Sequence, residues 1–399
     1  MTQPRIIHIE SLDALRATAG AWDDLWRRGE ATLPSLRAEL LAQWVEQFAR
    51  PEDFSAIAVE VKGRLAAALP LIRVGWDKRS AVPPTAENAR WGCASLDPPC
   101  FPIRHVRFLF RAAAMPCNEW SGSGDLLLEA DDAADEALRA LAAGIRETGV
   151  PLLWLDEATL DAARWRRFQQ ALSRGGMTVA GRRRWLVGRV EIDHDWPAYK
   201  ARWSRKHRQK TAQAARRLAE RGDVRLDVRS RLAPHEVETA MRQCFEIEDH
   251  GWKGAAGTSV LRTPGMAGFY VCQAEQAARW GQLEIVTLHC GGRPAAFSYG
   301  LSAKGVFHSI KIGYDPEYAE YHPGQLLRYY LLERFFADPE RKALDFQGPM
   351  TEAHAAWQPE RYAVGRVAVA PRGLAGRLAV LAYKHVWPWV RRGTGGGVD

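Results

Sequence analysis

Two stretches of the chain alternate apolar and polar residues around a two-residue turn. Residues 56–74 read AIAVEVKGRLAAALPLIRV around Lys62-Gly63, and residues 283–301 read LEIVTLHCGGRPAAFSYGL around Gly291-Gly292. Alternation with a period of two is typical of a half-buried strand, and glycine in a two-residue turn favours a β-hairpin. The sequence therefore predicts one hairpin in each half of the chain.

Each predicted hairpin is followed by an apolar-periodic helix and a short strand. The first helix opens near Asp132 and its strand near Leu152; the second helix opens at Pro323 and its strand at Ala343, so the spacing is 20 residues in both halves. A matched order and spacing of elements indicates duplication of one α/β module.

The second module has a start of helix that suits an anionic ligand. Residues 306–312 (VFHSIKI) read as a strand, and the helix that opens at Pro323 carries an apolar stripe. Proline suits the first helical turn. We expect the next donors, the N–H groups of Gly324, Gln325 and Leu326, to be unpaired, and with the helix dipole they would form a pyrophosphate cradle.

The first module lacks this feature. Its helix opens in EADDAADEA (residues 129–137), which places five acidic residues at or near the end where a phosphate would bind. Such a terminus repels anions. We therefore expect only the second module to bind a phosphorylated cofactor. The first module also carries a longer connection, with the Pro-rich segment 76–102, which is read either as a lid or partner-binding loop or as an insertion without a function.

Length and composition predict a folded protein with two globular units. The chain has 399 residues, of which 47% are hydrophobic, and it shows neither a secretory leader nor a long apolar run. We expect a cytoplasmic protein whose six cysteines are reduced thiols. A metal site at Cys93, Cys100 and Cys117 would need His105 or another fourth ligand, and we expect no metal.

The net charge of +8 arises within one segment. Residues 200–221 contain nine Lys or Arg residues and one acidic residue, Glu220, so the rest of the chain is neutral. Concentrated positive charge attracts phosphates, nucleic acid or anionic lipid, although a solvated basic helix is the simpler reading.

Five stretches of the chain resemble a known family. They are RWSRKHRQKTAQAARRLAERG (202–222), EDHGWKGAAGT (248–258), GRPAAFSYGL (292–301), IGYDPEYAEYHPGQLL (312–327) and LDFQGP (344–349). They resemble the CelD-like branch of the GNAT superfamily of CoA-dependent acetyltransferases, a branch associated with cellulose biosynthesis and akin to the FemAB-type aminoacyl transferases with two GNAT-like modules. The resemblance covers roughly residues 10–370 and is most specific from Trp196 to Trp357.

The resemblance implies an α/β (α+β) fold of two tandem GNAT-like modules, each a mixed, mostly antiparallel sheet flanked by helices. The expected division is an N-terminal module on the scaffold or acceptor side (1–190), a basic connecting helix and linker strand (191–230), a C-terminal module with the CoA site (231–372), and an amphipathic helix with a flexible tail (373–399). Two positions depart from the family pattern. The phosphate loop reads EYHPGQLL instead of Arg/Gln-x-x-Gly-x-Gly/Ala, and Ala353-His354 replaces an expected Tyr-Lys pair.

The implied reaction is acyl transfer from acetyl-CoA or another acyl-CoA, by direct attack of an acceptor amine or hydroxyl on the thioester. The candidate cofactor-binding residues are Ile310, Ile312, Gly313, Tyr314, His322, Gly324, Gln325 and Leu326. The candidate substrate-binding residues are Trp252, Lys253, Lys311 and His354. Lys311 lies on the strand face opposite His308 unless a bulge intervenes.

Three residues are candidates for the general base. Glu248 closes a predicted helix before a Gly-rich loop, at the position where the resemblance also implies a functional glutamate; a surface acid is the alternative. His308 has apolar neighbours, which also fits a satisfied core histidine. Asp345 interrupts the strand ALDF, and a carboxylate within a strand needs a partner.

Three functions stay open. The preferred one is acyl-CoA-dependent acylation of a small molecule or glycan precursor, such as a saccharide, amino sugar or amine. The second is aminoacyl transfer from tRNA, and the third is a non-catalytic adaptor that binds nucleic acid or a membrane. A peripheral contact of the basic segment or of the C-terminal helix with an anionic membrane, on its inner face, is a further expectation.

Overall fold

The computed structural model describes residues 3–74, 112–118 and 120–385. Contacts divide the chain into two compact units: unit 1 comprises Met1–Ala31, Ser35–Trp185 and Ala363–Asp399, and unit 2 comprises Thr32–Pro34 and Leu186–Tyr362. The Pro-rich segment 76–102 and the proposed ligands Cys93, Cys100 and His105 lie outside the described residues.

Unit 1 begins with one strand and a group of helices. Its elements are β1 (Arg5–Ile9), α1 (Leu12–Ala17), α2 (Ala19–Arg28), α3 (Ala38–Phe48), β2 (Phe54–Val61), β3 (Arg64–Val74), β4 (Ala112–Ala114), β5 (Leu127–Leu128), α6 (Ala134–Glu147), β6 (Leu152–Thr159), α7 (Ala163–Arg174), the first part of β7 (Thr178–Glu191), most of β13 (Glu360–Ala370) and α15 (Leu374–His385).

The sheet of unit 1 is mixed and mostly antiparallel. Its strand order is β1-β2-β3-β4-β6-β13, with β5 beside β3, and β4 and β6 form its parallel pair. Apolar residues alternate between the two faces of β6. Leu153 and Leu155 belong to a core with α6 and α7. Trp154, on the other face, packs edge-on against Tyr383 of α15, with ring centroids 5.0 Å apart.

Unit 2 repeats this order of elements. It contains the second part of β7, α8 (Trp196–Ala201), α9 (Arg205–Arg221), β8 (Val224–Arg229), α10 (Pro234–His250), α11 (Trp252–Ala255), α12 (Met266–Arg279), β9 (Leu283–Cys290), β10 (Arg293–Ala303), β11 (Val306–Tyr314), a 3₁₀ turn η5 (Pro316–Tyr321), α13 (Pro323–Ala337), β12 (Ala343–Pro349) and α14 (Glu352–Ala355).

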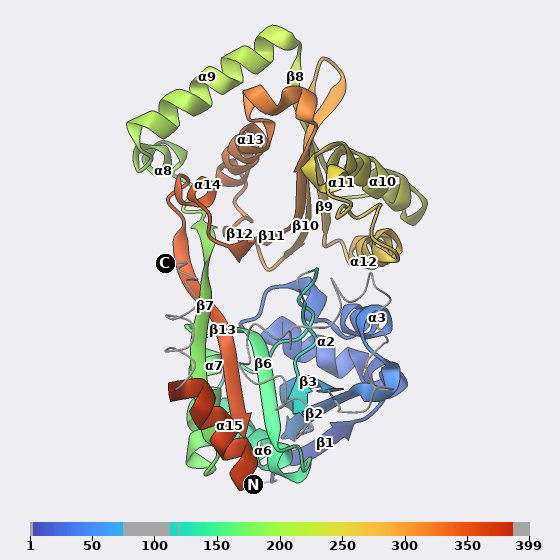
Figure 1. Ribbon diagram of the computed structural model, residues 1–399, viewed down its shortest axis with the longest axis vertical. Helices are drawn as coiled ribbons and strands as arrows, with labels where there is room; N and C mark the ends of the chain where they lie inside the picture. Colours follow the sequence, from blue (N-terminus) through green and yellow to red (C-terminus); the bar gives the residue numbers. More distant parts are fainter. Residues whose placement is uncertain (1–2, 75–111, 119, 386–399) are drawn as a thin grey trace. The chain divides into compact units, whose positions relative to one another are not determined.

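The sheet of unit 2 runs in the order β7-β12-β11-β10-β9-β8, and its parallel pair is β11 with β12. In Figure 1, α9 and α13 lie on one face of this sheet and α10, α11 and α12 on the other. The apolar stripe of α13 (Leu327, Leu331, Phe335) is buried in the core beneath the helix, as its spacing predicts.

Both predicted hairpins are confirmed. The turn residues Lys62 and Gly63 have φ of 52° and 80°, and Gly291 and Gly292 have φ of 56° and 81°. Positive φ at both central residues is the geometry of a type I′ turn, which matches the twist of the flanking strands. Since both units repeat hairpin, helix and strand in a mixed sheet flanked by helices, the predicted fold class is confirmed as well.

The end strand of each sheet lies far in the sequence from the strand with which it pairs. In unit 1, β6 pairs with β13, and in unit 2, β12 pairs with Val187–Glu191 of β7. This exchange explains why residues from Ala363 onward belong to unit 1. The expected division, in which residues up to 372 formed the C-terminal module, therefore differs from the observed one.

No helix among the described residues has the length and apolar content that crossing a bilayer requires. The described residues also contain no group of three or more His, Cys, Asp or Glu side chains arranged to hold a metal ion.

Candidate active site

The parallel strands of unit 2 separate partway along their length. β11 and β12 pair at Val306–Ala343, Phe307–Leu344 and His308–Asp345, and their pairing ends there. On its other side β11 stays paired with β10 up to Tyr314, with a bulge that skips Ile310 between the pairs Gly300–Ser309 and Tyr299–Lys311. One backbone edge of β11 beyond His308 is therefore free of strand partners at this fork, which we call the β11–β12 fork.

Helix α13 begins beside the fork without a side-chain cap. Its N-cap His322 has left-handed geometry (φ 51°, ψ 51°), and Pro323 occupies the first turn. The expectation of three unpaired donors is corrected: the N–H groups of Gln325 and Leu326 both donate to the His322 carbonyl, at 2.9 and 3.1 Å, because the N-cap carbonyl accepts the first i→i−4 bond of the helix, from Leu326, and a 3₁₀-type bond from Gln325. Gly324 keeps an N–H without a partner among the described residues, and nothing lies within 4 Å of the place where a Cβ would stand.

The matching helix of unit 1 begins differently. The carboxylate of Asp131 accepts the N–H of Ala133 at 2.8 Å immediately before α6, and Asp135 and Glu136 occupy its first turn. These acids favour the positive end of the helix dipole and leave no place there for a phosphate.

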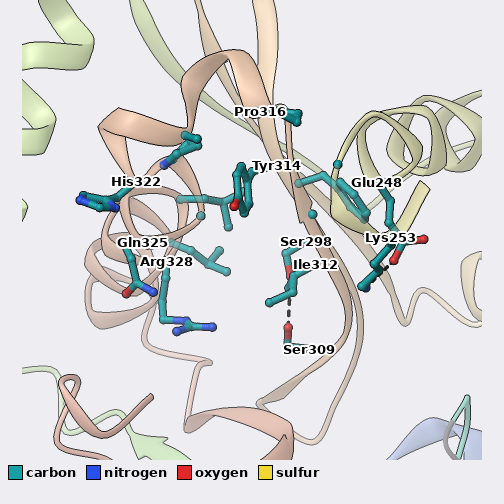
Figure 2. A pocket seen from close by; sticks show the side chains of 18 of the residues that line it. Glu248, Lys253, Ser298, Ser309, Ile312, Tyr314, Pro316, His322, Gln325 and Arg328 are labelled. Atoms are coloured by element: carbon teal, nitrogen blue, oxygen red, sulfur yellow. Dashed lines mark hydrogen bonds and ion pairs between the residues drawn. The ribbon is translucent and has the colours of Figure 1, made fainter. Parts of the chain in front are cut away.

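A cavity of about 640 Å³ lies at the β11–β12 fork. Figure 2 shows Gln325 and Arg328 on its α13 side and Glu248 and Lys253 on its α10 side, with β10 and β11 between them. Its lining comes from α10 and α11 (Glu248, Gly251, Trp252, Lys253), β10 (Phe297, Ser298), β11 (Phe307, Ser309, Ile312, Gly313, Tyr314), the η5 segment (Pro316, Ala319, His322), α13 (Pro323, Gly324, Gln325, Leu327, Arg328, Leu331) and Leu344.

Glu248 is the candidate base that lines the cavity. It lies in the last turn of α10 and is 4% exposed. One carboxylate oxygen accepts from Lys253 Nζ at 2.6 Å and the other from the N–H of Val260 at 2.9 Å. These contacts fix a buried carboxylate at the cavity wall, as a buried charge requires.

His308 and Asp345 are neighbours in the strand register but do not line the cavity. Asp345 accepts from the Tyr362 hydroxyl at 2.9 Å and from the N–H of Gln347 at 2.8 Å, and burial raises the pKa of Asp345. Burial, reinforced by the charge of Arg189, lowers the pKa of His308 to about 3. An imidazole with so low a pKa is a weak proton acceptor, so the geometry favours Glu248 as the base.

The predicted substrate-binding residues are placed differently from one another. Trp252 lines the cavity with 69% of its surface exposed, so it is not a buried anchor. Lys253 also lines the cavity, and its Nζ forms the ion pair with Glu248. Lys311 does not line the cavity, and its Nζ lies 5.0 Å from the centroid of the Tyr270 ring. Burial lowers the pKa of Lys311 to about 8. The bulge at Ile310 places Lys311 on the face that carries Tyr299.

Among the predicted cofactor residues, Ile312, Gly313, Tyr314, His322, Gly324 and Gln325 line the cavity, whereas Ile310 and Leu326 do not. The side chain of Gln325 accepts from Trp357 Nε1 at 2.8 Å, which holds it against the cavity wall.

Arg328 was not predicted from the sequence. It lines the cavity from the second turn of α13 and is 9% exposed. Burial lowers its pKa to about 10. In the sequence, Arg328 directly follows two leucines of the apolar stripe of α13. An exposed surface arginine occupies such a position as often as a buried one, so the sequence did not indicate that Arg328 lines a cavity.

A family model matches the part of the chain that holds the cavity. Residues 205–358 match the family model of the acetyltransferase (GNAT) domain. No curated protein matches the chain in sequence.

Solved structures resemble the chain over most of its length. FemX covers 95% of this chain and 100% of its own, with 11% identity and a TM-score of 0.56. L-PGS from Bacillus licheniformis covers 92% and 95%, with 10% identity and a TM-score of 0.48. A tandem GNAT protein from the clavulanic acid biosynthesis pathway covers 93% and 100%, with 16% identity and a TM-score of 0.43. The region that holds the cavity is thus similar in sequence to the acetyltransferase (GNAT) domain, and the chain resembles FemX in fold over 95% of its length.

Proposed function

We propose that the protein is an acyl-CoA-dependent acyltransferase whose reaction takes place in the cavity of unit 2. The observation that carries the proposal is the β11–β12 fork beside the uncapped start of α13. A strand edge with free backbone groups and a helix start with an open N–H together suit a ligand that has an amide-rich arm and a diphosphate. The match of residues 205–358 to the acetyltransferase (GNAT) domain supports the same reaction.

In this proposal the acyl-CoA lies along β11. The diphosphate binds at the N–H of Gly324, where the absence of a side chain leaves the backbone approachable. The pantetheine arm pairs with the free edge of β11 from Ser309 to Tyr314, against the exposed side chains of Ile312 and Tyr314 (48% and 41% exposed). The thioester then lies near the bulge at Ile310.

The acceptor enters from the α10 side, between Trp252 and Glu248. Its amine or hydroxyl attacks the thioester carbonyl and gives its proton to the Glu248 carboxylate. A carbon–nitrogen or carbon–oxygen bond forms, the carbon–sulfur bond breaks, and the CoA thiolate leaves and takes up a proton. No covalent intermediate on the protein is needed.

The acceptor class follows from the resemblance stated for the sequence. We place the protein in the CelD-like branch and propose acetyl transfer to a saccharide, amino sugar or amine precursor of an exopolysaccharide or of the cell envelope.

A second candidate function is aminoacyl transfer from tRNA, and helix α9 favours it. Arg217 and Arg221 of this helix pair with Glu320 and Glu317. Five other cations are exposed on α9 and form no ion pair with any described residue: Arg205, Lys206, Arg208, Lys210 and Arg216. An exposed row of unpaired cations is the electrostatic footprint of a polyanion.

A thermal-shift comparison separates the two functions. We expect acetyl-CoA and CoA to stabilise the protein, by about 2.7 kcal/mol at a hundredfold excess over Kd, and adenosine to have no effect. Acyl-CoAs of increasing length then report the acyl preference. If CoA leaves the unfolding temperature unchanged while tRNA binds with a steep dependence on salt, acyl transfer from CoA is wrong and the second candidate holds.

A further inference from the structure

Arg328 is a buried cation without an anionic partner. It forms no ion pair with any described residue, and its Nη1 atom has no hydrogen-bond partner there. Its guanidinium instead lies over two aromatic rings, 4.5 Å from the centroid of Phe346 and 5.9 Å from that of Trp357. In Figure 2 the side chain extends from α13 into the cavity.

This arrangement costs free energy in the unliganded protein. A buried cation loses its hydration, and contact with aromatic rings restores only part of it. A methionine of similar length would fill the same space without that cost. An unpaired guanidinium N–H on a residue that lines a cavity indicates that an anion of the ligand completes the pair.

A second polar atom without a partner belongs to His354, which contacts the same Phe346 ring as Arg328. His354 stacks on the ring of Phe346, with centroids 4.7 Å apart and planes inclined by 24°, and its Nδ1 has no partner among the described residues. Burial, reinforced by the Arg328 charge, lowers the pKa of His354 to about 4. Its ring is therefore neutral near pH 7, so the positive charge at this wall belongs to Arg328.

The site differs from the diphosphate position at the start of α13. Arg328 is four residues beyond Gly324, which places its backbone about 6 Å further along the helix axis, away from the end where the dipole attracts phosphate. Aromatic rings cover the guanidinium, so its edge is the part available to a ligand. One buried cation balances one negative charge, and the planar guanidinium edge matches a carboxylate through two parallel hydrogen bonds.

We propose that Arg328 forms a carboxylate-binding subsite at the inner wall of the cavity, so that one of the two substrates carries a carboxylate. This inference rests on the proposed acyl transfer and names its substrate class. Two sources supply the same chemistry: a dicarboxylic acyl group on CoA, or an acceptor of the amino-acid type. In both cases the carboxylate is held and does not react.

Binding measurements on the unaltered protein distinguish the two sources. Calorimetry compares succinyl-CoA with acetyl-CoA and CoA; in the presence of CoA it then compares amino acids with amines that lack the carboxylate, such as tyrosine with tyramine and phenylalanine with phenethylamine. We expect at least about tenfold tighter binding of the carboxylate form in one arm, the value of one charge-assisted hydrogen bond. Equal binding within both arms overturns the inference.

Two variants assign the preference to Arg328. Arg328→Met should abolish it and leave the Kd of CoA within about twofold, and Arg328→Lys should restore part of it, since lysine keeps the charge but lacks the planar edge. Arg334→Met is the matched control, because Arg334 is an exposed residue of the same helix outside the cavity lining.

The outcomes separate the two proposals. If Arg328→Met weakens CoA itself as much as every other ligand, Arg328 binds the diphosphate and the carboxylate subsite is wrong, while acyl transfer stands. If CoA fails to bind the unaltered protein, the proposed function fails first. Should the variant not fold, the comparisons on the unaltered protein still decide whether a carboxylate preference exists.

Discussion

At the scale of single residues, the proposed acyl transfer depends on Glu248. This carboxylate is buried at the cavity wall and held by Lys253 and the N–H of Val260. The other two candidate bases, His308 and Asp345, are buried together behind the fork, where Gln347 contacts both of them. Their contacts suit a role in keeping the ends of β11 and β12 in place.

Replacing Glu248 by glutamine should remove proton acceptance and keep the shape of the wall. We expect turnover to fall by about 10² to 10⁴-fold, the usual contribution of a general base, with the Kd of acetyl-CoA unchanged. Release of the CoA thiol in the presence of amine and saccharide acceptors measures turnover.

Glu246→Gln is the matched control, since Glu246 is an exposed acid of the same helix. Wild-type turnover in the Glu248→Gln variant would contradict the assignment and turn attention to Lys311, whose pKa of about 8 lets a neutral amine form near physiological pH.

At the scale of elements, the start of α13 is open where that of α6 is acidic. Gly324→Asp places an acidic residue in the first turn of α13, as in the first turn of α6. A carboxylate in the first turn stabilises a helix through its dipole, by about 0.3–1 kcal/mol, so the variant should unfold at the same or a higher temperature. The same charge repels a diphosphate, and we expect CoA to bind at least about tenfold more weakly.

The opposite signs of these two effects separate repulsion from misfolding. Gly268→Asp places the same charge in the first turn of α12, at another glycine with nothing within 4 Å of its absent Cβ, and should leave CoA binding unchanged. Undiminished CoA affinity in Gly324→Asp would show that the diphosphate binds elsewhere.

The elements differ in how well the sequence predicts them. The two hairpins and α13 depend on local patterns, namely alternation, a glycine turn and a proline at the first turn, and these patterns hold regardless of the rest of the chain. The burial of Arg328 depends on Phe346 and Trp357, which approach it only through the fold. The N–H of Gln325 donates to the His322 carbonyl three residues earlier, a 3₁₀-type bond at the helix start that the residue types alone do not specify. The exchange of β7 and β13 depends on pairings between distant segments, which no local pattern encodes.

At the scale of the whole molecule, two units with one order of elements carry one proposed cofactor site. Hydrogen exchange tests this asymmetry. We expect acetyl-CoA to slow exchange in β11 and in the first turns of α13, because a bound ligand suppresses local opening there. The equivalent elements of unit 1, β4 and α6, should exchange as before.

Adenosine is the control for this experiment, since it lacks both the diphosphate and the pantetheine arm. Equal protection of α6 and α13 would contradict a single site, and protection confined to α9 by tRNA would favour the second candidate function.

The exchange of β7 and β13 also sets the order in which a ribosome can complete the protein. Unit 2 is almost wholly a continuous stretch from Leu186 to Tyr362, whereas unit 1 is interrupted by it and needs residues from Ala363 onward. During synthesis, the half that emerges first must wait for its closing strand until the residues beyond Tyr362 have been made. A stop codon shortly after Tyr362 would therefore destabilise unit 1, which lies at the start of the sequence, more than unit 2, which lies directly before the stop.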